Sequence, residues 1–83
     1  MPYIKPEERE AMDRVVYAMS VNDVKVNGDL NYILYKFCKT KIKPSYNNYK
    51  NFIGELNECA AEIRRRILSE YEKEKISENG DVI

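Results

Sequence analysis

The feature that most constrains the fold is a long apolar stripe in the second half of the chain. The stripe consists of Tyr49, Phe52, Ile53, Leu56, Ala60, Ile63, Ile67 and Tyr71. Its spacing of three and four residues places these side chains on one face of an α-helix. Pro44 keeps this helix from beginning earlier, and Ser45 is a suitable N-cap. We therefore predict a helix over about 46–74, about 42 Å long.

Two shorter helical patterns precede this helix. Pro6 suits the first position of a helix, because the N–H that proline lacks would have no partner there. Asn27 or Asp29 can cap the next pattern. We predict helices over about 6–20 and 29–40 on these grounds.

These patterns predict an all-α fold with three helices, in which the long C-terminal helix is packed by the two shorter ones. A chain of 83 residues makes one domain, so we expect a single helical domain over 1–83. The apolar faces of all three helices are expected to form one core. Its predicted members are Met12, Val15, Val16, Met19, Leu30, Ile33, Leu34, Phe37, Phe52, Ile53, Leu56, Ile63 and Ile67.

The lengths of the helices leave two arrangements open. The shorter helices would be about 21 Å and 18 Å long, so neither alone covers a partner of about 42 Å. If the long helix is continuous, part of it stays open to a partner. If it kinks at Gly54, a closed bundle can form instead. Chains of this size bury only about 60% of their unfolded surface and often oligomerise.

The second predicted helix has two faces of different character. Leu30, Ile33 and Leu34 mark the face expected in the core. Aromatic and basic residues lie opposite, and tyrosine is enriched at protein interfaces because its ring is apolar and its hydroxyl is polar. We predict a homodimer, the commonest symmetric assembly, formed with the exposed part of the long helix. The alternative is an ordinary solvated surface. The interface candidates are Tyr32, Tyr35, Lys36, Lys39, Tyr46 and Tyr49.

The charges are balanced overall but separated along the chain. There are 14 basic and 14 acidic residues. Residues 30–54 hold five lysines and no acid, whereas the segments on either side are net acidic. Lysines interleaved with tyrosines over 32–50 favour an alternative, an acidic partner or a nucleic acid. A net charge of zero argues against nucleic acid.

The sequence shows little that points to catalysis. It has no histidine and three scattered glycines, so histidine-based triads and glycine-rich phosphate loops are absent. Glu55 and Glu58, followed by Glu78 and Asp81, resemble the metal-binding carboxylates of all-α nucleotide pyrophosphohydrolases of the MazG type, which would hold Mg²⁺. That pattern needs the second pair on a helix, and Asn79-Gly80 predicts a turn there. We therefore predict no enzyme activity, no catalytic or metal-binding residue and no cofactor.

The two cysteines and the hydropathy point to one compartment. Cys38 and Cys59 lie on or beside apolar stripes, where a free cysteine behaves as a small hydrophobe. We predict two buried free thiols, as in a reducing cytosol. The N-terminal residues lack the apolar region of a signal peptide, and no run is long enough to cross a membrane. A cytoplasmic protein without a membrane partner is expected.

Short segments across nearly the whole chain carry a family resemblance. They are MPYI at 1–4, GDLNY at 28–32, ECA at 58–60 with Arg65-Arg66 soon after, Tyr71-Glu72, and NGDV at 79–82. On these segments the chain resembles a family of small uncharacterised proteins from bacteria, archaea and phages. The resemblance implies a stand-alone cytosolic domain and supplies no catalytic residue.

Overall fold

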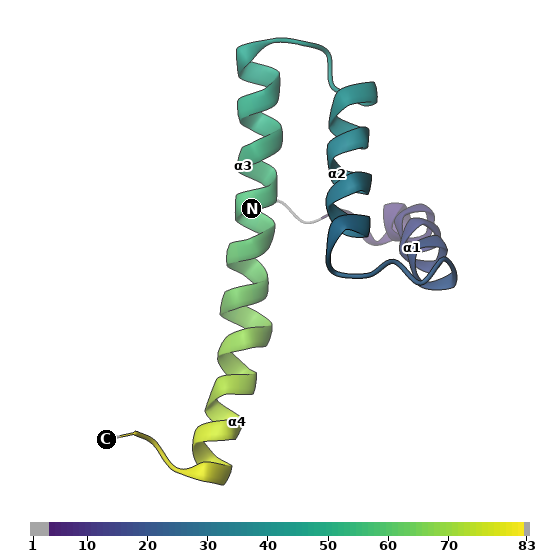
Figure 1. Cartoon of the computed structure of the whole chain (residues 1–83). Helices are drawn as coiled ribbons and strands as arrows, with labels where there is room; N and C mark the ends of the chain where they lie inside the picture. The colour runs from purple at the N-terminus through teal and green to yellow at the C-terminus, as the bar shows by residue number, and fades with distance from the viewer. Residues whose placement is uncertain (1–3, 83) are drawn as a thin grey trace. The chain divides into compact units, whose positions relative to one another are not determined.

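The computed structural model describes residues 4–82, which form three helices joined by short loops (Figure 1). The first three residues of the MPYI segment and Ile83 lie outside this range. No strand occurs between residues 4 and 82, so the prediction of an all-α fold with three helices is confirmed. The elements are α1 (Pro6–Val21), α2 (Gly28–Lys41), α3 (Tyr46–Ile63), η1 (Arg64–Leu68) and α4 (Ser69–Asn79).

The helices begin where the sequence signals predict. Pro6 occupies the start of α1, where its missing N–H is not needed. The Asn27 side chain accepts a hydrogen bond of 3.0 Å from the Asp29 N–H. Ser45 accepts one of 3.0 Å from the Asn48 N–H. Each cap satisfies a backbone donor that has no partner within its own helix.

The long helix ends five residues later than predicted, at Asn79. The apolar spacing fades after Tyr71, but ion pairs within the helix continue. Lys73 lies 3.5 Å from Glu70, and Lys75 lies 3.1 Å from Glu78; such pairs support an exposed helix. The helix stops at Gly80, whose φ of 83° is a left-handed conformation that glycine adopts without strain.

The chain divides into two compact units, residues 1–43 and 44–83. In the first unit, α1 runs across the direction of α2, and a short loop joins them (Figure 1). A shallow hollow of about 330 Å³ lies between the end of α1 and the start of α2, lined mainly by Val16, Met19, Val24 and Leu30. The prediction of one domain over 1–83 stays a prediction.

The second unit is built on one continuous helix, because α3, η1 and α4 follow without a break. The helix passes through Gly54 without interruption. Of the two predicted alternatives, the long helix is therefore continuous and is not kinked at Gly54. One wide turn lies further along: the Ser69 N–H donates to the Arg64 carbonyl, five residues back. Such a π turn is a local widening of the helix.

No residue between positions 4 and 82 is buried. Members of the predicted core such as Val16, Phe37 and Ile67 are mainly exposed. The prediction of a buried core is therefore wrong within each unit taken by itself. A helical stripe is buried only when other elements cover it, and neither unit holds enough elements to enclose its own stripe.

Candidate interaction surfaces

The predicted outer face of α2 is present and accessible. We call Tyr32, Tyr35, Lys36 and Lys39 the tyrosine–lysine face. The two tyrosines are 62% and 67% exposed, whereas Leu30, Ile33 and Leu34 on the other side of the helix are half-buried. The two-faced character read from the sequence therefore corresponds to a real difference in exposure.

Tyr32 and Lys36 form a pair within this face. The Lys36 Nζ donates a hydrogen bond of 3.1 Å to the Tyr32 hydroxyl. The same nitrogen lies 5.4 Å from the centre of the ring, within the range of a cation–π contact. The pair holds the ring close to the helix, with the phenol and the ammonium both reachable from solvent.

The other two predicted tyrosines lie on a different element. Tyr46 and Tyr49 belong to α3, in the second unit. Both are exposed, and the Lys50 Nζ lies 5.8 Å from the centre of the Tyr46 ring. The six predicted residues therefore lie on two elements, α2 and the start of α3, which belong to different units. They form one cluster on α2 and a second one at the start of α3.

Sequence reasoning missed a third tyrosine–lysine pair. Lys75 Nζ lies 5.5 Å from the centre of the Tyr71 ring, on α4. The signal was available, because a tyrosine followed four residues later by a lysine recurs along the chain. It occurs at 32/36, 35/39, 46/50 and 71/75. The spacing is that of neighbours on a helix surface, so the pattern by itself indicates helix stabilisation rather than a binding site.

A long accessible apolar surface follows α3 to α4. We call it the long stripe, defined as Tyr49, Phe52, Ile53, Leu56, Ala60, Ile63, Ile67 and Tyr71. Its members range from half-buried to mainly exposed, for example 38% at Leu56 and 65% at Ile67. An amphipathic helix of a folded protein normally buries such a face. Large accessible apolar surfaces mark sites of association.

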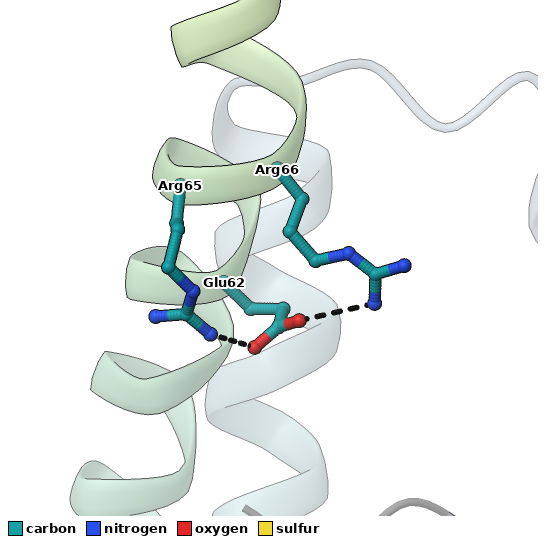
Figure 2. A network of polar contacts seen from close by, with 3 residues as sticks. All are labelled: Glu62, Arg65 and Arg66. Atoms are coloured by element: carbon teal, nitrogen blue, oxygen red, sulfur yellow. Dashed lines mark hydrogen bonds and ion pairs between the residues drawn. The ribbon is translucent and has the colours of Figure 1, made fainter.

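A polar network lies where α3 meets η1 (Figure 2). The Glu62 carboxylate accepts hydrogen bonds from Arg65 and, at 3.2 Å, from Arg66. Its side chain is only 15% exposed, because the two arginines lie over it. The arginines themselves are well exposed, so each pair contributes little to stability. The Glu62 carboxylate neutralises one of the three positive charges of Arg64, Arg65 and Arg66.

The acidic pairs do not form a recognisable metal centre. Glu78 lies in the last turn of α4, and Asp81 follows the end of the helix. Within residues 4–82, no group of three or more acidic, cysteine or histidine side chains is arranged to hold a metal ion. The physical reason is the continuous helix, which separates Glu58 from Glu78 by 20 residues, about 30 Å.

The cysteines differ from the prediction in one respect. Both are free thiols, and Cys38 is half-buried on α2, but Cys59 is exposed on α3. The prediction of two buried thiols is therefore wrong for Cys59. Its place beside the long stripe was read correctly, and the stripe itself is not covered.

Among residues 4–82, no helix combines the length and apolar character needed to cross a membrane. In comparisons with known proteins, residues 1–82 match a family model described as "Domain of unknown function (DUF6899)". No curated protein and no solved structure matches the chain.

Proposed function

The chain belongs to the DUF6899 family, and we propose that it is a self-associating helical interaction module whose basic form is a homodimer. The observation that carries this proposal is the long stripe. A helix of 34 residues, α3 through α4, presents this stripe along one face with no member buried. Water contact with so many apolar side chains is unfavourable, by roughly 25 cal/mol for each Å².

A second copy is the simplest partner for two reasons. Most soluble oligomers are homodimers with two-fold symmetry. The chain also carries both signs of charge in separate segments, with five lysines and no acid over 30–54 and eight acids over 55–83. One copy can therefore supply the complementary charge for the other. Two free thiols are the state expected in a reducing compartment, so we propose the cytoplasm as the location.

Solution mass tests the proposal directly. We expect light scattering at high micromolar concentration to give twice the chain mass of 9.8 kDa. Ile63→Asp places a charge in the middle of the long stripe and should give a monomer, because a buried unpaired carboxylate is strongly unfavourable.

The matched control is Ala61→Asp, which adds the same charge two residues away. A step of two residues leads to the opposite side of a helix, so this variant should keep the dimeric mass. Circular dichroism should show helical spectra for both variants. A monomeric wild-type chain would mean that the stripe is covered within one chain, and would overturn the proposal.

A further inference from the structure

The long stripe has an internal symmetry centred on Ala60. Two pairs of stripe residues stand at equal distances before and after this position: Tyr49 and Tyr71 at eleven residues, and Ile53 and Ile67 at seven. A third pair is one residue from equal, because Leu56 lies four residues before Ala60 and Ile63 three residues after it. Read from either end, the face therefore presents a similar series of aromatic and branched side chains. The series spans about 33 Å of helix.

From this symmetry we propose that two copies pair through the long stripe as antiparallel helices, with the two-fold axis at Ala60. The inference rests on the proposed homodimer and specifies its arrangement. A two-fold axis across an antiparallel pair brings each residue opposite the one at the same distance on the other side of the axis. Tyr49 of one copy then meets Tyr71 of the partner copy, and Leu56 lies beside Ile63, with a difference in height of one residue, about 1.5 Å. The stripe gives this arrangement apolar partners for most of its members.

The arginine run argues against the parallel alternative. Arg64, Arg65 and Arg66 are consecutive. In a parallel pair the two runs would lie at the same height, on helices about 8–10 Å apart. In the antiparallel pair they lie about 15 Å apart along the axis, because each is five residues from the centre. That separation exceeds the screening length of about 8 Å at physiological salt.

The centre of the stripe is made of small residues, the exposed Cys59 and Ala60. Small side chains let two helices approach closely at the axis, while the larger aromatic and branched side chains pack further out. The centre lies within α3, before the wide turn at η1. The placement of Leu56 beside Ile63 therefore does not depend on that turn.

Disulfide cross-linking distinguishes the two orientations. The background is Cys38→Ser with Cys59→Ser, and each test chain carries one new cysteine, Leu56→Cys or Ile63→Cys. In the antiparallel dimer, position 56 lies beside position 63, so an equimolar mixture of the two chains should form a covalent dimer on oxidation. Each variant alone should not, because its two copies of the cysteine are about 9–12 Å apart along the axis, beyond the reach of a disulfide.

Each result decides one statement. Covalent dimer formed by Leu56→Cys alone would show a parallel pair and overturn the antiparallel arrangement while the homodimer stands. If the mixture forms no cross-link although both reduced variants are dimeric by light scattering, the interface lies elsewhere and the antiparallel arrangement is also overturned. A monomeric wild-type chain would instead overturn the proposed function.

Discussion

Cys59 lies one residue before the proposed two-fold axis, and its thiol is exposed in the chain by itself. A side chain at this position is accessible in a monomer and covered when a second helix packs over Ala60. Cys59 can therefore serve as a native probe of association, without any added label at the interface.

We expect the reaction of Cys59 with a thiol reagent to slow as protein concentration rises, because only the monomer reacts. In a Cys38→Ser chain, the rate should fall about tenfold when the concentration reaches about 100 times the dissociation constant. The rate can be followed by absorbance. The Ile63→Asp variant should react fast at every concentration. A reaction rate of the Cys59 thiol that does not change with protein concentration would contradict the proposed interface at Ala60.

At the scale of the element, Gly54 shows how the long helix tolerates an unfavourable residue. The helix continues through it, and no atom lies within 4 Å of the position that a Cβ would occupy. Glycine costs a helix interior roughly 1 kcal/mol relative to alanine. Gly54 is two residues from Leu56, so it faces away from the long stripe.

Gly54→Ala should therefore raise the free energy of unfolding by about 0.5–1 kcal/mol and leave the dimeric mass unchanged. Urea unfolding followed by circular dichroism, at a fixed protein concentration, measures the first effect, and light scattering the second. A loss of association would show that another backbone approaches Gly54 in the assembly.

Gly80→Ala is the matched control, since it makes the same change where the backbone demands glycine. Its φ of 83° is strained for alanine whatever the space around it. The free energy of unfolding should therefore fall or stay the same, opposite to the effect at Gly54.

At the scale of the whole molecule, the separation of charge along the chain raises a second candidate function, nucleic-acid binding. The tyrosine–lysine face and the start of α3 lie within the segment 30–54, which holds five lysines and no acid. Exposed tyrosines beside lysines are suited to stacking on bases next to phosphates. The net charge of zero opposes this use, because nucleic-acid binding depends on an overall attraction to phosphate.

We expect no mobility shift of single-stranded DNA or RNA at micromolar protein and physiological salt. A shift that weakens steeply with salt, and that Lys36→Glu with Lys39→Glu abolishes, would establish nucleic-acid binding instead. The same double variant should keep the dimeric mass, because the long stripe lies on another element. This separates the two functions in one set of proteins.

The sequence by itself determined the features that depend on neighbouring residues. Helical spacing, Pro44 and the caps at Asn27 and Ser45 gave three helices close to their observed bounds, because each signal acts within a few residues of backbone. The two faces of α2 followed from the same spacing, and their difference in exposure agrees with it. For the same reason the six interface candidates could be named but not grouped, since Tyr32 and Tyr46 belong to different elements.

Only the tertiary structure decided what covers each helix. Burial of Ile67 or Cys59 depends on segments far away in the sequence, and periodicity shows which face is apolar without showing what lies against it. The predicted core and the predicted burial of Cys59 failed for this reason. The wide turn between Arg64 and Ser69 had no sequence signal either, because a single hydrogen bond shifted by one residue leaves the pattern of residue types unchanged. A stripe on a helix is a local property, whereas its cover is supplied by the rest of the molecule or by another copy.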